Sequence, residues 1–594
     1  MTGVRNLTLL LAITIAGRFV VQAQSQTPPA GAIALRGATL ISGAGDATIP
    51  DSVIVIQGDK IVAFGGRNTS VPTGATVIDL AGKFIIPGLI DSHVHYEEWM
   101  GELFLNHGVT TAMGIGTDLP RVKTASSNAS YRTPRLYDSA GRPDFNGAMS
   151  EDQVRKNVRA WIEKKPDFTK MPDYNDSTKA AYAWAADEIH RAGLMIFGHT
   201  ENAVESVGRG LDVIEHLWGF AVPQMTAQEH DDFQTGKYLH WAAFLRDTNR
   251  TEQMMREVIA GGAYLNPTQL YEMGSFSPRA AEFEQEVYQL LQDQSLAAYY
   301  PQSISHSVMQ RLHEARNFSK KYENKMMMSH IAPADLVEFK AGYEISKRFV
   351  KRWVELGGKI HAGTDTVTGG TVGLGLHQEM EMLVEAGLTP MQALQSATIW
   401  SAEKLAGKKG ARGNPLVGTL AAGSFADLVV LSADPLRDIR NTRKIERVMK
   451  AGEFIKLGYT SSYYSFTQTP RRISGATPTP EISAIAPHTV VEGSADFELT
   501  VRGVGYTGST VVKVNGVAVP TSFVNPRTLR AKVPGAMVRS ALPNPFNAPG
   551  PLQNNGVFGD PTIPVTTYNP PPEGGTSNSI SLRIRAKWMG LENE

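Results

Sequence analysis

Residues 88–98 have the sequence GLIDSHVHYEE, and they continue an apolar run, KFIIPGLI, that begins at residue 83 and is typical of a buried strand. Successive side chains of a strand point to opposite faces, so His93 and His95 lie on the same face. Two neighbouring imidazoles on one face can bind one metal ion. A chain with 14 histidines can contain such a pair by chance, so the interpretation as a metal site depends on the rest of the sequence.

The region around this pair alternates between strand-like and helix-like segments. Helical segments such as STKAAYAWAADEIHRAG end at glycine, as a helix C-cap does. Eight strands alternating with helices predict a (β/α)8 TIM barrel over residues 83–409. Residues 272–345 are too long for a loop, and we expect a helical insertion there, after the seventh strand. The predicted strands are KFIIPGLIDSHVH, GVTTAMGIG, PRLYDSA, DFTKMPD, LMIFGHT, DVIEHLW, AYLNPTQ and KIHAGTDT.

Strand-rich segments flank the predicted barrel. Residues 31–82 and 410–457 consist of short alternating runs separated by turn signals such as QGDK and AGDA. Residues 458–480 form a Ser/Thr/Pro-rich linker. Residues 481–590 again alternate, with a hairpin signal at Asn515-Gly516, and predict a C-terminal β-sandwich.

Composition limits the possible function classes. The 594 residues are too many for one core. Lys plus Arg equals Asp plus Glu, at 58 each, which gives no electrostatic basis for binding nucleic acid or an anionic membrane. The chain has no cysteine, so disulfides, thiolate metal sites and cysteine nucleophiles are excluded.

The N-terminus resembles a signal peptide. A weakly basic start, the short apolar run LTLLLAITIAG and the small-residue site VVQA predict cleavage after Ala23. We therefore expect a periplasmic or secreted protein whose mature chain has no transmembrane segment.

Candidate metal ligands stand at the ends of the predicted barrel strands, where barrel enzymes place catalytic residues. Each of them alone could be an ordinary polar residue at a strand end, so the prediction of a metal centre depends on the whole set and on the resemblance described next. The set is His93, His95, Lys170, His199, His216 and Asp365.

In these residues, and in their order along the chain, the sequence resembles the amidohydrolase superfamily. The segments GLHQEMEMLVEAGLTPMQALQSATIWSAEKLA and GTLAAGSFADLVVLSADPLRDIRNTRKIERVMKAG are similar to its imidazolonepropionase-like and Xaa-Pro dipeptidase branch. The resemblance covers roughly residues 32–457. It implies that segments 31–82 and 410–457 fold together into one β-sandwich beside the barrel. The C-terminal module resembles the immunoglobulin-like IPT/TIG group.

The resemblance also implies the roles of the site residues. His93, His95 and Asp365 would hold one divalent ion, His199 and His216 a second, with zinc expected for both. Lys170 would bridge the two ions as a carboxylated lysine, because an ammonium group would repel them. Asp365 would also move a proton during hydrolysis of an amide.

Candidate residues for substrate contact are not part of a motif. Tyr137, Arg142 and Tyr271 follow strand ends and are candidates for binding a substrate carboxylate, with ordinary loop residues as the alternative. His377 is a candidate supporting residue, and His361 is expected on the strand surface.

Three functions stay open at this point. The first is hydrolysis of peptide-like amides such as Xaa-Pro dipeptides or N-acyl amino acids. The second is hydrolysis of cyclic amides or lactones, as by imidazolonepropionase, and the third is a non-catalytic surface-binding protein. The expected partner is a small molecule and not a nucleic acid, and a homo-oligomer is compatible with the sequence.

Overall fold

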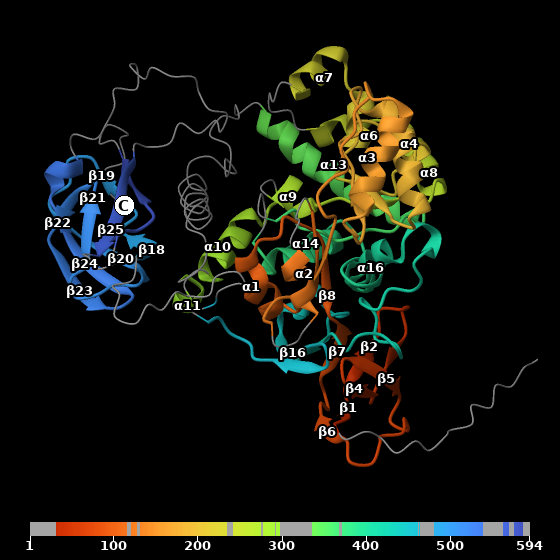
Figure 1. Ribbon diagram of the computed structural model, residues 1–594, viewed down its shortest axis with the longest axis horizontal. Coiled ribbons are helices and arrows are strands. Elements are labelled where there is room, and N and C mark those ends of the chain that lie inside the picture. Colours follow the sequence, from red (N-terminus) through yellow and green to blue (C-terminus); the bar gives the residue numbers. More distant parts are fainter. Residues whose placement is uncertain are drawn as a thin grey trace, which may run out of the picture.

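The computed structural model describes residues 31–115, 120–127, 131–234, 241–274, 277–290, 293–297, 335–366, 371–460, 463, 480–538, 562–569 and 575–585. The predicted signal peptide, most of the linker and part of the predicted insertion lie outside these residues. The described residues form a mixed α/β structure with strand-rich parts on either side in sequence (Figure 1).

Two sheets flank the central α/β region, and one of them joins distant parts of the chain. The first has the order β5-β4-β1-β6 and the second the order β17-β16-β15-β7-β2-β3. In the second, β7 pairs with β15 so that Ile85 lies opposite Val430. Their strands are β1 (Ile33–Arg36), β2 (Thr39–Ile41), β3 (Thr48–Ile49), β4 (Val53–Gln57), β5 (Lys60–Gly65), β6 (Thr76–Asp79), β7 (Phe84–Pro87), β15 (Leu428–Leu431), β16 (Ile445–Lys450) and β17 (Glu453–Ile455).

The apolar run at residues 83–95, predicted as one strand, is two strands in different sheets. β7 belongs to the flanking sheet, whereas β8 (Leu89–Val94) belongs to the central parallel sheet. Gly88 stands at the junction, where a β-carbon would lie 1.9 Å from Thr110 Oγ1. Glycine is needed at this position because the Thr110 side chain, from the neighbouring residues 109–114, leaves no space for another side chain.

The central strands are parallel and form two groups: β8, β9 and β10, and β11 to β14. The groups meet where the Asp167 N–H donates to the Asp138 carbonyl. Residues 360–366 make parallel bridges to β14 at Leu265 and to β8 at Val94, so parallel contacts continue around a ring. The strands are β9 (Val109–Gly114), β10 (Arg135–Asp138), β11 (Thr169–Lys170), β12 (Ile196–Gly198), β13 (Val213–Glu215) and β14 (Tyr264–Asn266).

Helices connect and surround these strands (Figure 1). The described helices are α1 (Gly101–Asn106), α2 (Pro120–Ser126), α3 (Glu151–Ile162), α4 (Lys179–Arg191), α5 (Ala203–Gly208), α6 (Trp218–Ala221), α7 (Ala227–Gln234), α8 (Thr248–Ala260), α9 (Gln269–Met273), α10 (Ala280–Leu290), α11 (Gln294–Ala297), α13 (Asp335–Glu355), α14 (Leu374–Glu385), α15 (Pro390–Ser396) and α16 (Ile399–Ala406). Helix α3 begins with a capping box, in which Ser150 and Gln153 satisfy each other's backbone N–H groups.

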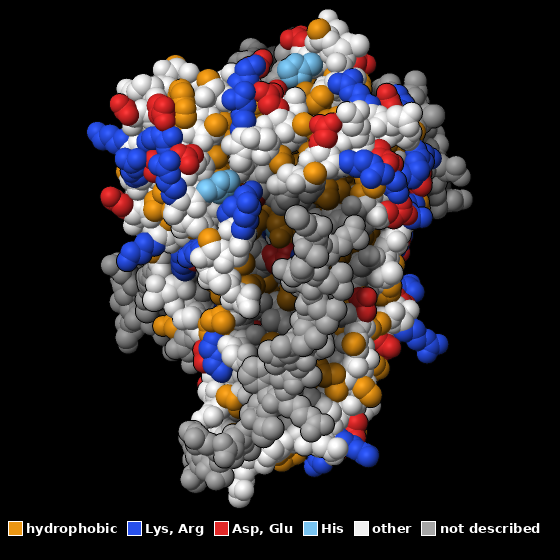
Figure 2. All heavy atoms as spheres, turned by 90° about the vertical axis from the view of Figure 1, so that its right-hand side faces the viewer, with side chains coloured by type: hydrophobic (Ala, Val, Ile, Leu, Met, Phe, Trp, Pro, Cys, Tyr) orange, Lys and Arg blue, Asp and Glu red, His pale blue; other side chains and the backbone are white. Residues whose placement is uncertain are grey.

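The outer face of α3 and α4 carries closely mixed charges. Arg155 pairs with Asp187 and Glu188, and Arg191 pairs with Asp187. Figure 2 shows basic and acidic side chains interspersed over this face. The mixture agrees with a chain of zero formal net charge.

The C-terminal module consists of two sheets with their own apolar core, which includes Leu499, Val512 and Leu529. Among the described residues, no helix is both long and apolar enough to cross a membrane. The strands of the module are β18 (Glu481–Ala486), β19 (Thr489–Val491), β20 (Phe497–Val504), β21 (Val511–Val514), β22 (Val517–Val519), β23 (Thr521–Asn525), β24 (Thr528–Val533), β25 (Thr562–Asn569), β26 (Gly575–Thr576) and β27 (Ile580–Arg585).

Candidate metal centre

His93, His95 and Asp365 meet at one point above the parallel strands. The Nε2 atoms of both histidines lie 3.1 Å from Asp365 Oδ1. One ligand atom from each of the three residues fits within 4.8 Å of the others. The backbone fixes this arrangement, because the Asp365 N–H donates to the His93 carbonyl at 3.0 Å. His93 is buried and His95 is half-exposed, so the group opens toward solvent on the His95 side.

His199 and His216 adjoin this group. Their ring centroids are 5.0 Å apart, and the His216 ring is 5.8 Å from the His93 ring. His216 Nε2 lies 3.8 Å from Asp365 Oδ2. Asp365 therefore stands between the two pairs of histidines predicted for two ions.

Lys170, at the end of β11, is fully buried. Within the described part of the chain, its Nζ has no hydrogen-bond partner. Burial lowers the pKa of Lys170 to about 8, although the nearby Glu215 carboxylate opposes this shift. A lowered pKa makes the neutral amine, the form that can react with carbon dioxide, more accessible at neutral pH.

Three carboxylates that the sequence analysis missed lie beside the histidines. Glu215 accepts a hydrogen bond from His93 Nδ1. Asp173 Oδ1 lies 3.2 Å from His199 Nδ1. Glu272 Oε1 lies 3.1 Å from His216 Nδ1, which is hydrogen-bonded to the Thr268 hydroxyl at 2.6 Å. A carboxylate at Nδ1 leaves Nε2 as the lone-pair nitrogen and orients it, which is the common arrangement behind metal-bound histidine.

Opposite charges in the centre shift each other's pKa values toward the charged forms. Burial alone would lower the pKa of His93, but the Glu215 and Asp365 carboxylates raise it to about 9. In return, His93 holds the pKa of both carboxyl groups well below the usual range, against the effect of burial. The pocket thus keeps Asp365 ionised, the form that can accept a proton or bind a cation.

Backbone strain is concentrated at the same strand ends. His216 and Asp365 are in the left-handed region, with φ of 61° and 50°, although neither is glycine. Gly363 packs so closely against β8 that a β-carbon would lie 2.6 Å from His93 Cβ. The chain therefore adopts costly local conformations at the points where it positions ligand side chains.

Part of the chain is similar to a known protein family. Residues 346–455 match the model of the amidohydrolase family. Over this segment the chain is similar to the amidohydrolase family.

Two curated relatives match parts of the chain. The adenine deaminase of Chelativorans sp. (strain BNC1) is 33% identical over 206 residues, which are 32% of this chain and 32% of the deaminase. The imidazolonepropionase of Streptomyces griseus is 43% identical over 47 residues, which are 8% of this chain and 12% of the relative. The chain thus matches about a third of the length of the first relative and an eighth of the second.

The fold is shared more widely than the sequence. The structure of phenylurea hydrolase B is 16% identical to this chain with a TM-score of 0.51, covering 74% of this chain and 100% of the hydrolase. At this level of identity the similarity concerns the fold alone. It matches the prediction of a mixed α/β amidohydrolase fold.

The side chains of His93, His95 and Asp365 fit a divalent cation. All candidate ligands are nitrogen or oxygen donors, and each buried histidine has a carboxylate beside its Nδ1. The buried Nζ of Lys170 has no hydrogen-bond partner among the described residues, and a carbamate on it would supply oxygen donors to a cation. Zinc, two ions and carboxylation of Lys170 remain predictions.

Two of the predicted substrate residues lie beside the centre. Arg142 follows β10, is 43% exposed, and lies 3.7 Å from Asp173, the partner of His199. Tyr271 on α9 has its ring 5.7 Å from the ring of His216. Both side chains can therefore contact a molecule bound at the metal centre.

Tyr137 and His377 are not brought to the centre. Tyr137 packs against a separate apolar cluster that includes Ile90 and Phe425. His377, on α14, is buried, with Nδ1 2.8 Å from Thr442 Oγ1 and Nε2 2.9 Å from the His107 carbonyl. Since His107 directly precedes β9, His377 lies at the opposite end of the strands from the ligands.

His361 also differs from expectation. It was predicted on the strand surface, but it is fully buried with its ring 4.5 Å from the ring of Tyr264. The prediction was wrong because the segment 360–366 lies between β14 and β8 and has neighbours on both sides.

Proposed function

We propose that this chain is a metal-dependent hydrolase that cleaves the carbon–nitrogen bond of small peptide-like amides. The observation that carries the proposal is the position of Asp365, within 3.1 Å of the Nε2 atoms of both His93 and His95. The similarity to the amidohydrolase family supports a hydrolase of this class.

Each group has a role in this proposal. Two divalent ions, when held by the predicted ligands, would supply Lewis-acid polarisation of the carbonyl and a lowered pKa for water. Asp365 accepts the proton of the attacking water and delivers it to the leaving amine, because its carboxylate is held ionised next to the reacting centre. Glu215 holds His93 in the tautomer that presents Nε2 to a cation.

Arg142 supplies a recognition group for a free carboxylate. Its guanidinium is the type of group that binds a carboxylate through two parallel hydrogen bonds. It is exposed and lies next to Asp173, so it can reach a substrate placed at His199. Dipeptides or N-acyl amino acids with a free C-terminal carboxylate are therefore the proposed substrates.

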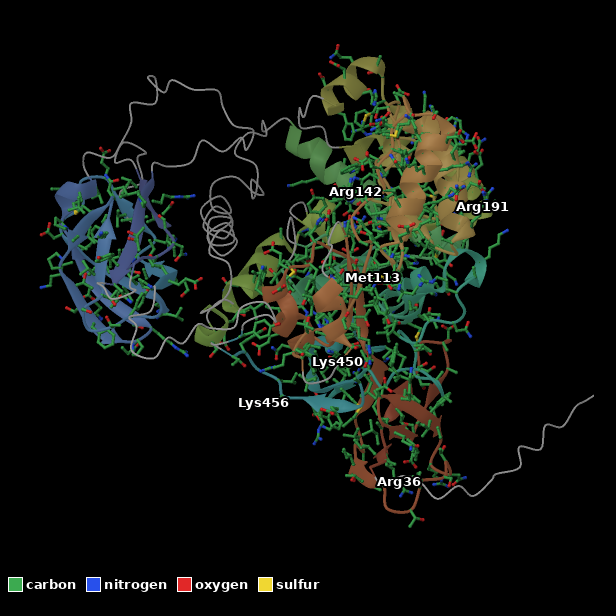
Figure 3. All side chains as sticks on the ribbon, in the orientation of Figure 1. Arg36, Met113, Arg142, Arg191, Lys450 and Lys456 are labelled. Atoms are coloured by element: carbon green, nitrogen blue, oxygen red, sulfur yellow. The ribbon has the colours of Figure 1, made fainter. Side chains whose placement is uncertain are left out.

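The test compares matched acids and C-terminal amides in the presence of zinc, manganese or cobalt. We expect kcat/KM for the acid to exceed that for the amide at least tenfold, roughly 1.4 kcal/mol, and Arg142→Ala to remove this preference. Arg191→Ala is the control, because Arg191 is an exposed arginine on the outer helices (Figure 3). Equal rates for acid and amide in the unaltered protein would refute carboxylate recognition.

Hydrolysis of a cyclic amide is the second candidate function. The 43% identity to an imidazolonepropionase over 47 residues favours it. Turnover confined to imidazolones or lactones would establish this function in place of the first. No turnover on either panel by protein with bound metal would support the non-catalytic alternative.

We also propose export through the segment 1–23. Its sequence has the three parts of a signal peptide. N-terminal sequencing of protein released into the periplasm of a bacterial host should begin at Gln24. Recovery of an intact Met1 in the membrane fraction would contradict export.

A further inference from the structure

Lys404 is a fully buried lysine that reaches the metal centre from outside the ring of strands. It belongs to α16, which follows the last parallel segment. Its Nζ donates to the Ser92 carbonyl at 2.8 Å and lies 4.3 Å from the centroid of the Phe197 ring. No candidate ligand is on α16, so neither the resemblance nor the proposed chemistry assigns this ammonium group a role.

The hydrogen bond to Ser92 acts on the backbone that carries His93. The Ser92 N–H donates to the Ala362 carbonyl at 3.0 Å, so this residue is held to the segment that carries Asp365. Lys404 holds the other side of the same residue through its carbonyl. Together the two bonds fix Ser92, the residue immediately before His93.

We propose that Lys404 is a positioning residue of the metal centre, which fixes the Ser92 carbonyl, in the peptide bond that leads to His93, so that His93 presents Nε2 to the metal. The inference rests on the proposed function, because it assumes that His93 is a ligand. Lys404 acts through Ser92.

The test measures cobalt binding by the full chain without substrate. Lys404→Met removes the charge and the donor but keeps most of the volume. We expect its affinity for Co²⁺, measured by competition with a chelator, to fall at least tenfold, and the visible absorption spectrum of bound cobalt to change. Lys404→Arg restores a buried cation and should recover part of the affinity.

Lys450→Met is the matched control. Lys450 is also fully buried and donates to a backbone carbonyl, that of Tyr131, at 3.2 Å. It lies on β16 in the flanking sheet, on the opposite side of Met113 from Arg142 (Figure 3). We expect Lys450→Met to lower the thermal unfolding temperature while leaving the cobalt affinity and spectrum unchanged.

The outcomes are distinct. A folded Lys404→Met protein with unchanged cobalt affinity and spectrum overturns the inference. If Lys404→Met does not fold, Lys404→Gln is measured in the same way: tenfold weaker binding supports the inference and unchanged binding overturns it. An unaltered chain that binds cobalt but hydrolyses no amide refutes the proposed function alone, whereas one that binds no cobalt refutes the metal centre and this inference with it.

Discussion

At the scale of single residues, the centre depends on pairs of groups in which one side chain sets the state of the other. His93 with Glu215 is the tightest example, since both are buried and each stabilises the charged form of its partner. Lys170 differs, because its buried Nζ has no hydrogen-bond partner among the described residues. This makes Lys170 the most informative residue to change.

Lys170→Ala should abolish binding of two ions, because the group proposed to bridge them is removed. Metal analysis of the purified protein should show at most one ion per chain, and kcat/KM should fall at least a hundredfold. Added formate or acetate should recover part of the activity by occupying the vacated position. Lys170→Arg should be as inactive as Lys170→Ala, because a guanidinium stays charged. Full metal content in either variant would exclude Lys170 as a ligand.

Glu379 is a buried carboxyl group that connects stability to pH. Burial raises its pKa to about 8, from 4.5, although it accepts hydrogen bonds from the Gln269 and Leu270 N–H groups. The folded protein therefore binds this proton more tightly than the unfolded chain does. Its contribution to stability is full below pH 4.5 and is lost as the pH rises toward 8.

Glu379→Gln should remove this pH dependence. Relative to the unaltered protein, its midpoint of thermal unfolding should rise between pH 5 and pH 8 and then level off. Glu163→Gln is the control, because Glu163 is exposed, and its difference from the unaltered protein should be the same at each pH. A constant difference for Glu379→Gln as well would show that Glu379 is ionised throughout.

At the scale of elements, the segment 360–366 determines where Asp365 lies. Thr364 donates to the Asp91 carboxylate through its N–H at 3.1 Å and its hydroxyl at 2.7 Å, which ties this segment to β8 two residues before His93. Gly363 allows the close approach, because the space for its side chain is filled by His93 and Asn266.

Gly363→Ala should displace His93 from Asp365. A β-carbon at residue 363 would lie 2.6 Å from both His93 Cβ and Asn266 Nδ2, and overpacking of this kind costs about 1–3 kcal/mol. We expect cobalt affinity to fall about tenfold or more. Gly66→Ala has nothing within 4 Å of the new carbon and should bind cobalt like the unaltered protein. Equal affinities in the two variants would show that the segment can shift at no cost to the site.

At the scale of the whole molecule, the first residues of the linker belong to the central region. The Thr460 N–H donates to Glu102 at 2.8 Å, and the Tyr463 hydroxyl donates to the Arg132 carbonyl at 3.0 Å. The C-terminal sheets, by contrast, have a core of their own. We therefore expect the functional boundary to lie after Tyr463.

A chain ending at Ser465 should keep its metal and its kcat/KM within about twofold. A chain ending at Leu457 should unfold at a lower temperature, because it lacks the contacts of Thr460 and Tyr463. Differential scanning calorimetry with metal analysis distinguishes the two. Loss of metal from a folded chain ending at Ser465 would make the C-terminal module part of the site.

Much of the central region could be predicted from the sequence, because the patterns that indicate its strands and helices are local. Alternation along a strand and glycine after a helix depend on neighbouring residues, and the predicted parallel strands from the second to the seventh coincide with β9 to β14 to within a few residues. His93, His95 and Asp365 were identifiable because short motifs mark them at strand ends. The split of residues 83–95 at Gly88 was missed, because both strands are apolar and only their partners differ.

Only the tertiary structure decided which polar residues support the site. Glu215, Asp173 and Glu272 have no motif, and Lys404 lies 234 positions after Lys170; each matters because the fold places it against a histidine or a strand end. The same long-range packing places His377 and Tyr137 outside the metal centre. The sequence by itself determined which residues with nitrogen or oxygen ligand atoms stand at the strand ends, since the strands follow from a local pattern. The partners of those residues depend on contacts between distant segments, which no local pattern encodes.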